Sequence, residues 1–222
     1  NIGKPVLELS PLKEGSVRLL ELSSYQIELA KDLAPNIAAF INFSSDHLQR
    51  HGGLGGYFYA KARLFLENLT DMSVINIDTA EGMFLYQRLN SVDNKIIAIS
   101  SKLDVRDYLW AVNLKGYFIT EWKNGRQIYS FDLRNLGDSF FSLRESVVTV
   151  YAVARSFGIA PKNILTKCDG FVPLAHRNQW VDVIKGVAFI NDSKATNVDA
   201  TIHALKTHIN VHLILGGRAK ED

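Results

Sequence analysis

Several polar residues that could bind an anion follow an apolar segment near the end of the chain. Residues 187–190 read Val-Ala-Phe-Ile and lead into Asn-Asp-Ser-Lys-Ala-Thr-Asn at 191–197. Apolar residues then recur at helical spacing, with Asn197 suited to the N-cap and Asp199 to the positive end of the helix dipole. The polar run therefore lies between a strand end and a helix start, where phosphates and nucleotides are often bound. An ordinary strand–helix connection with capping side chains has the same spacing, and spacing alone does not separate the two.

Two earlier segments have the same form, a predicted buried strand that ends in polar side chains. The predicted strand 17–22 has Glu21 near its end, and Ser23 and Ser24 follow it. This carboxylate and these two hydroxyls could bind a hard cation with its phosphate ligands. The alternative is a serine-rich turn with a solvated Glu21. Residues 37–42 lead into His47, at the end of a strand where α/β sheets place ligand-binding groups.

A third candidate, Lys61, lies on a predicted amphipathic helix over residues 57–69. Phe58, Ala62 and Phe65 share its apolar stripe, and Lys61 lies beside the stripe, as a solvated helix lysine would. The glycine-rich run 52–56 before this helix predicts a flexible segment. It lacks the Lys-Ser/Thr of a phosphate-binding P-loop, and none of the 222 residues supplies that loop.

The remaining elements alternate as in a doubly wound α/β sheet. A strand at 73–78, a helix at 80–89 and a strand at 95–100 predict a mostly parallel sheet. Residues 109–131 read as a meander at the sheet edge, with a hairpin signal at Asn124-Gly125.

The last part of the chain reads as a long helix, a linker and a second unit. The helix is predicted at 143–157, with Gly158 after it and an apolar face of Val147, Val150, Tyr151 and Ala154. The linker is predicted at 171–177. Strands at 181–184, 187–190 and 211–215 are predicted after it, in a new unit with the helix that follows Asn197.

Composition excludes several classes of protein. The net charge of +2 on 222 residues, with scattered basic side chains, argues against a nucleic-acid partner. No apolar run approaches the roughly 20 residues of a membrane helix. The single cysteine, Cys168, rules out an internal disulfide and fits the cytoplasm. Asn1 is not a start methionine and the chain stops just after an apolar run, so we expect a piece of a longer protein.

Six motifs, in order along nearly the whole chain, resemble those of the Mur ligase family. Two of them, at 21–26 and 191–197, resemble its D-glutamate-adding branch. The six motifs are Glu-Leu-Ser-Ser-Tyr-Gln at 21–26, Asn-Phe-Ser-Ser-Asp-His at 42–47, Tyr-Ala-Lys-Ala-Arg-Leu at 59–64, His-Arg at 176–177, Asn-Asp-Ser-Lys-Ala-Thr-Asn at 191–197, and Leu-Gly-Gly at 215–217 with Lys220. The resemblance implies a central ATP-binding domain at 1–173 without its phosphate loop. It also implies the start of a Rossmann-like, glutamate-binding C-terminal domain at 174–222.

The implied reaction is ATP-driven amide formation in peptidoglycan synthesis. D-glutamate would be joined to UDP-N-acetylmuramoyl-L-alanine through an acyl phosphate, by a cytoplasmic monomer that binds small molecules and neither nucleic acid nor membrane. Mg²⁺ would be the metal cofactor. Because the phosphate loop would lie upstream of Asn1, we expect the 222-residue chain alone to be inactive.

The resemblance also implies roles for individual residues. Glu21, His47 and a carbamylated Lys61 would hold magnesium, and a carbamate gives oxygen ligands where an ammonium would repel the cation. Asp192 and Arg177 would contact the nucleotide, Arg177 through a phosphate. Asn1 and Ser23 would bind substrate, with Asn1 near the sugar nucleotide. Lys194, Thr196 and Lys220 would lie where D-glutamate and the acyl phosphate meet.

One segment departs from the family pattern. The family's His-Asn-x-x-Asn around the adenine site corresponds here to Ser142-Leu143-Arg144-Glu145-Ser146. Without the two asparagine amides, a degenerate, non-catalytic binding module of the same fold is an alternative. A folate polyglutamate enzyme would share the fold but should lack the Asp-Ser-Lys-Ala-Thr-Asn string.

Overall fold

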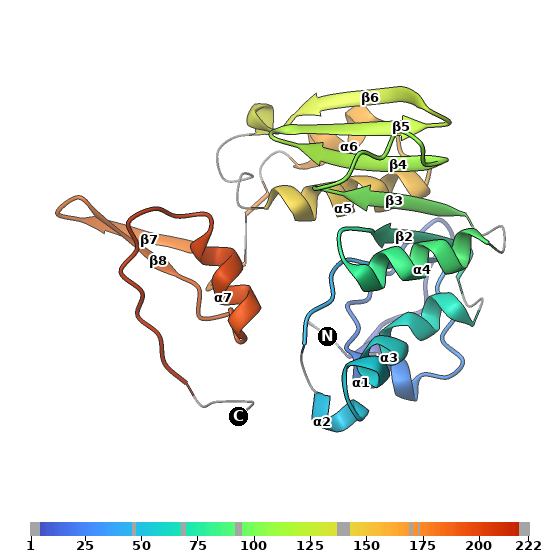
Figure 1. The fold of residues 1–222 in the computed structure, drawn as a ribbon, viewed down its shortest axis with the longest axis horizontal. Coiled ribbons are helices and arrows are strands. Elements are labelled where there is room, and N and C mark those ends of the chain that lie inside the picture. Colours follow the sequence, from blue (N-terminus) through green and yellow to red (C-terminus); the bar gives the residue numbers. More distant parts are fainter. Residues whose placement is uncertain are drawn as a thin grey trace.

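The computed structural model describes residues 5–45, 48–67, 70–91, 95–136, 143–168, 171–172 and 174–217. Its centre is a six-stranded sheet in the order β1-β2-β3-β4-β5-β6 (Figure 1). The strands are β1 (Ile37–Phe40), β2 (Met72–Asn76), β3 (Ile96–Ser100), β4 (Trp110–Lys115), β5 (Phe118–Lys123) and β6 (Arg126–Asp132). β1 to β4 are parallel, whereas β4, β5 and β6 are antiparallel. The predicted mostly parallel sheet with an edge meander is confirmed.

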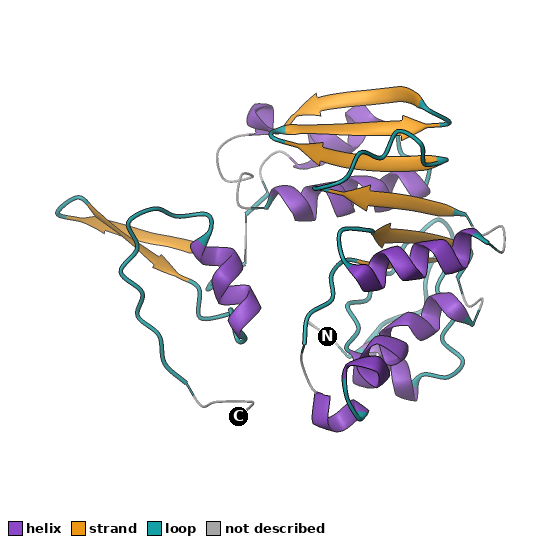
Figure 2. Ribbon diagram, viewed as in Figure 1, coloured by secondary structure: helices purple, strands orange, loops and turns teal. Residues whose placement is uncertain are grey.

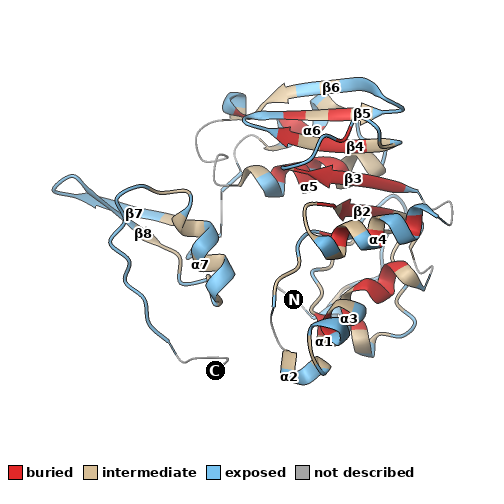
Figure 3. Cartoon of the chain, in the orientation of Figure 1, coloured by how far each residue is buried: buried red, intermediate tan, exposed pale blue. Residues whose placement is uncertain are grey.

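Helices cover both faces of this sheet, as a doubly wound fold requires (Figure 2). On one face lie α1 (Ser24–Leu29), α3 (Leu54–Leu66) and α4 (Ala80–Asn90), whose apolar side chains pack on β1, β2 and β3. On the other lie α5 (Arg144–Ser156) and α6 (Pro161–Cys168), packed on β2, β3 and β4. Because helices bury both of its faces, β3 is buried along its whole length (Figure 3).

Local sequence explains most of the element ends. Asn124 and Gly125 both have positive φ, 50° and 73°, as the tight turn between β5 and β6 requires. Thr79 caps α4 by accepting the N–H of Gly82. Gly158, predicted to end the long helix, has a φ of 77° just after α5.

The C-terminal part forms a separate small sheet. β7 (Gln179–Ile184) and β8 (Val187–Asn191) make an antiparallel hairpin, and α7 (Val198–Leu205) follows, with Asn197 as its N-cap. The short α2 (Leu48–His51) and the 3₁₀ turns η1 (Val6–Glu8) and η2 (Leu133–Leu136) complete the described elements.

Four predictions about elements are wrong. Residues 17–22 and 211–215 form no strand, and Leu19 and Ile214 are 88% and 96% exposed, because neither segment is paired with a strand in the described part of the chain. α3 begins at Leu54, so the glycines of the supposedly flexible run cap and open a helix. Val150 is 52% exposed, because only the Val147 and Tyr151 side of that face of α5 meets the sheet.

Candidate functional site

Glu21 and Ser23 lie at the entrance to α1. Ser23 is the N-cap: its hydroxyl accepts the N–H of Gln26 at 3.3 Å, and its own N–H donates to Gln26 Oε1 at 2.9 Å. This reciprocal pair is a capping box, which fixes how the chain enters the helix. The side chain of Glu21 is exposed before this turn. The Ser23 hydroxyl therefore has a structural partner, and its role toward a substrate stays a prediction.

A cavity of about 420 Å³ lies beside the loop after β1. It is lined by Phe43, Ser44, Ser45, Leu54, Glu81 and Asp199. The two carboxylates come from the first turns of α4 and α7, so the cavity lies between the large sheet's helices and the C-terminal unit. In the sequence, Asp199 has only the pattern of a helix-dipole residue, and no motif marks Glu81. No spacing in the sequence indicates that these two first turns face one cavity.

Lys61 is half-buried on α3, and its ammonium lies over the ring of Tyr57 at 4.9 Å from the centroid. A cation over an aromatic face is attracted by the ring quadrupole. Lys61 is therefore not the freely solvated lysine that its helical position suggested.

The structure brings the predicted nucleotide residues together at the end of β8. The backbone N–H of Asn178 donates to Asp192 Oδ1 at 2.8 Å, and the N–H of Lys194 donates to the carbonyl oxygen of His176 at 3.0 Å. The His176–Asn178 turn, which includes Arg177, is thus bonded to the strand end that carries Asp192 and Lys194.

This turn has an unusual backbone. His176 and Asn178 both have positive φ, 65° and 46°, which costs free energy for non-glycine residues. Their side chains hold it: His176 Nδ1 lies 2.9 Å from Asn191 Nδ2, and Asn178 Oδ1 lies 2.7 Å from His208 Nε2. The sequence indicated the His-Arg pair and the motif that begins at Asn191, but not Asn178 and His208, because these two belong to no motif.

The remaining predicted residues are not brought to one point. Arg177, Lys194 and Thr196 are exposed. Asn1, His47, Ser142 and Lys220 lie outside the described residues. Within the described part of the chain, no group of three or more His, Cys, Asp or Glu side chains could hold a metal ion.

Leu143, which the resemblance aligns with an asparagine of the family's predicted adenine site, precedes α5 and makes no side-chain capping bond. Its side chain packs against the apolar cluster formed by α5, α6 and the sheet. An apolar, inward-packed side chain cannot read a base edge by hydrogen bonding, so Leu143 does not supply the contact that the resemblance implies for this position.

Comparison with known proteins decides the family. The sequence profile of the Mur ligase middle domain matches residues 4–138. The chain belongs to the Mur ligase family. The UDP-N-acetylmuramoylalanine–D-glutamate ligases of Cereibacter sphaeroides and Roseobacter denitrificans are 44% and 43% identical over 100% of this chain and 48% of their own length. This Mur ligase chain thus spans about half the length of the curated relatives it matches.

Solved Mur ligases share the fold. A UDP-N-acetylmuramoyl-L-alanyl-D-glutamate–2,6-diaminopimelate ligase superposes with a TM-score of 0.57 at 24% identity, over 84% of this chain and 38% of that one. MurF from Acinetobacter baumannii also gives 0.57, at 13% identity, over 82% and 38%. Among the described residues, no helix is long and apolar enough to cross a membrane.

Proposed function

We propose that the full-length protein containing this Mur ligase chain joins D-glutamate to UDP-N-acetylmuramoyl-L-alanine at the expense of ATP, in peptidoglycan synthesis. One observation carries the choice of amino acid. The identity of 44% to a D-glutamate ligase extends over the whole chain, whereas the diaminopimelate ligase of solved structure is 24% identical.

The reaction has two steps. A carboxylate oxygen of the sugar nucleotide takes the γ-phosphoryl group of ATP, and ADP leaves. The amine of D-glutamate then attacks the carbonyl carbon, loses a proton, and expels phosphate together with the former carboxylate oxygen. Negative charge accumulates in both steps, so fixed positive groups favour them.

The C-terminal residues suit the charged substrates. Arg177 can bind a nucleotide phosphate through two parallel hydrogen bonds. Asp192, bonded to the turn that carries Arg177, is proposed to contact the nucleotide as well. Lys194, Thr196 and Lys220 are proposed to face D-glutamate and the acyl phosphate.

Magnesium is proposed to bind Glu21, His47 and a carbamylated Lys61. The bound ion would neutralise charge on the transferring phosphoryl group. Glu21 supplies the exposed carboxylate oxygen that this hard cation prefers. Lys61 fits only as a carbamate, because the ammonium now over Tyr57 would repel a cation.

The organisation of the chain follows the same proposal. Residues 1–173 would be the central ATP-binding domain and residues 174–222 the start of the glutamate-binding domain, in keeping with the two separate sheets. We propose a cytoplasmic monomer.

Amine specificity tests this function. Purified full-length protein with ATP, magnesium and UDP-N-acetylmuramoyl-L-alanine should release phosphate with D-glutamate, and at least about 100-fold more slowly with L-glutamate, L-alanine or diaminopimelate. Equal or faster turnover with one of those three would contradict the assignment.

A non-catalytic module of the same fold is the second candidate, favoured by Leu143. It predicts that the full-length protein binds a nucleotide or a protein partner, measured by calorimetry, and forms no amide with any of the four amino acids.

A further inference from the structure

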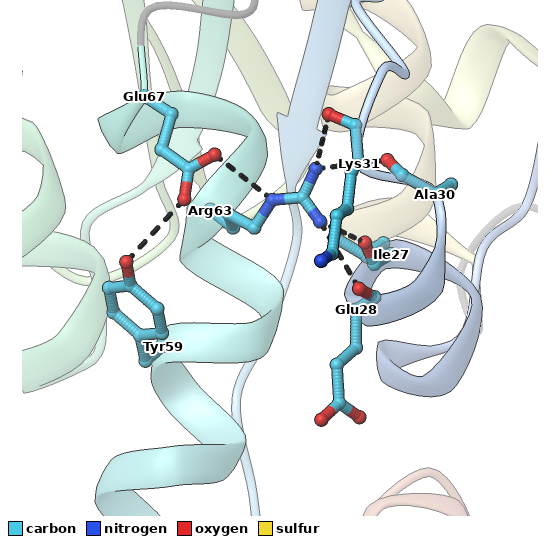
Figure 4. A network of polar contacts seen from close by, with 7 residues as sticks. All are labelled: Ile27, Glu28, Ala30, Lys31, Tyr59, Arg63 and Glu67. Atoms are coloured by element: carbon cyan, nitrogen blue, oxygen red, sulfur yellow. Dashed lines mark hydrogen bonds and ion pairs between the residues drawn. The ribbon is translucent and has the colours of Figure 1, made fainter.

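Arg63 on α3 is a buried cation directed at the end of another helix (Figure 4). Its side chain is 9% exposed, and its Nε donates to Glu67 Oε2 at 3.1 Å. The two terminal nitrogens donate to main-chain carbonyls: Nη1 to Ile27 at 2.6 Å, and Nη2 to Ala30 at 2.9 Å and to Lys31 at 2.8 Å. Most of the hydrogen bonds of the guanidinium therefore go to main-chain carbonyl groups.

The Ile27 carbonyl lies in the last turn of α1, where a helix leaves its last carbonyl groups without helical partners, and the Ala30 and Lys31 carbonyls lie at the C-cap and directly after it. α1 has only six residues, and a helix this short is marginal without support from outside. A cation at its negative end also complements the helix dipole. Arg63 thus adds, from α3, side-chain donors to the C-terminal end of α1, where the Ala30 N–H already donates to the carbonyl oxygen of Gln26.

The other end of α1 is held from α2. Ser24 Oγ lies 3.0 Å from Nε2 of His51, the last residue of α2, and the His51 side chain is 2% exposed. Ser23, the N-cap, and Glu21 directly precede this end. The segment that carries both proposed site residues therefore enters a helix fixed at both ends.

We propose that Arg63 is a positioning residue for the ligase site, an inference that rests on the proposed function. α3 carries both Lys61 and Arg63, so one rigid helix sets where Lys61 stands relative to the Glu21–Ser23 segment. Arg63 touches no substrate. It acts by preventing α1, and with it Glu21 and Ser23, from shifting away from Lys61.

The test compares Arg63→Met, Arg63→Lys and Arg50→Met in the full-length protein. Rates are measured per folded molecule, well below the unfolding temperature, with magnesium and each substrate varied. Arg63→Met should lower kcat/KM for the sugar nucleotide at least about tenfold and raise the magnesium requirement, since displacements of about 1 Å cost catalysis heavily. Arg63→Lys, which can still donate to some carbonyls, should recover part of the loss.

Arg50→Met is the matched control. Arg50 also touches α1, through Glu28 Oε2 at 3.0 Å, but its side chain is 47% exposed. Exposed ion pairs contribute little, so its kinetic constants should stay within about twofold of wild type.

Hydrogen exchange of residues 24–31 supplies a readout independent of turnover. Faster exchange together with the kinetic loss in Arg63→Met supports the proposal, and wild-type exchange in Arg63→Met overturns it. Wild-type kinetic constants with faster exchange would also overturn it, leaving Arg63 purely structural. If Arg63→Met does not fold, Arg63→Lys decides by the same criteria. A wild-type protein without D-glutamate-dependent turnover would refute the proposed function, while exchange still reports whether Arg63 fixes α1.

Discussion

The backbone N–H of Asn178 donates to the carboxylate of Asp192 at 2.8 Å, across fourteen residues of sequence. This bond joins the turn that carries Arg177 to the end of β8. Asp192 is therefore both a proposed nucleotide contact and the acceptor that holds a strained turn in place.

Substitution of Asp192 should separate these two uses. Asp192→Asn keeps a side-chain oxygen for Asn178, whereas Asp192→Ala leaves that N–H without an acceptor, at a cost of about 1–3 kcal/mol. We expect Asp192→Ala to lower the unfolding free energy of the C-terminal unit and raise KM for ATP at least about tenfold. Calorimetry and steady-state kinetics measure both effects.

The control for this prediction is Asp182→Ala. Asp182 accepts only the N–H of its neighbour Val183 among the described bonds and is exposed. Asp182→Ala should leave the unfolding free energy of the C-terminal unit and the KM for ATP near their wild-type values. An Asp192→Ala protein with unchanged KM for ATP would remove Asp192 from the nucleotide site.

Lys61 and Lys123 form a matched pair, since each places its ammonium over an aromatic ring, at 4.9 Å from Tyr57 and 4.4 Å from Trp110. Loss of a metal-binding carbamate should make Lys61→Ala nearly inactive in the full-length enzyme, whereas loss of a cation–π contact alone costs about 1 kcal/mol. Acetate or formate should restore part of the Lys61→Ala rate by supplying the missing oxygens. Lys123→Ala should retain its rate and ignore added carboxylate. Equal behaviour of the two variants would make Lys61 a packing residue.

Gly55 and Gly56, adjacent in the first turn of α3, should respond oppositely to alanine. A Cβ on Gly56 would lie 1.9 Å from the carbonyl oxygen of His51, whereas a Cβ on Gly55 has no heavy atom within 4 Å. Gly56→Ala should separate α2 from α3 and lower stability by more than about 2 kcal/mol. Gly55→Ala should raise it by about 0.5–1 kcal/mol through helix propensity. Denaturant unfolding of both variants measures this, and a stable Gly56→Ala protein would show that α2 does not pack so closely.

Alkaline pH should destabilise the central sheet through Tyr151. Its burial, and then its 2.7 Å hydrogen bond to the Glu121 carboxylate, raise the pKa of Tyr151 well above the ordinary value of 10.0. Above that pH the unfolded state loses a proton that the folded state keeps, so stability falls as pH rises, by at most about 1.4 kcal/mol per unit. Below pH 10 this linkage contributes no slope.

Tyr151→Phe removes the titrating group. Its unfolding free energy should be lower than wild type near pH 8, because Glu121 loses a donor, but should fall less steeply between pH 10 and 11. Parallel slopes for the two proteins would assign the alkaline loss to other groups.

The sequence predicted the elements whose signal is local. Short apolar runs predicted β1 to β3, the Asn124-Gly125 pair predicted the β5–β6 turn, and Asn197 predicted the start of α7. Residues 17–22 and 211–215 have the same apolar character, yet form no strand, because a strand also needs a neighbour to pair with, which local sequence cannot specify.

The candidate site divides in the same way. The motif around Asp192 and the His176-Arg177 pair were readable, and the structure joins them. The contacts of Arg63 with α1 were not readable, because an arginine beside an apolar helix stripe has the same sequence signature whether it faces water or carbonyl groups. The meeting of Glu81 and Asp199 at one cavity depends on how distant elements pack.

Isotope transfer tests the central claim most directly. UDP-N-acetylmuramoyl-L-alanine labelled with ¹⁸O in its carboxylate is incubated with the full-length protein, ATP, magnesium and D-glutamate, and amide and phosphate are analysed by mass spectrometry. An acyl phosphate requires that each amide formed be accompanied by one phosphate carrying one carboxylate oxygen. We predict that result, with no transfer when D-glutamate is replaced by L-glutamate. Unlabelled phosphate, or phosphate release without amide, would contradict the account.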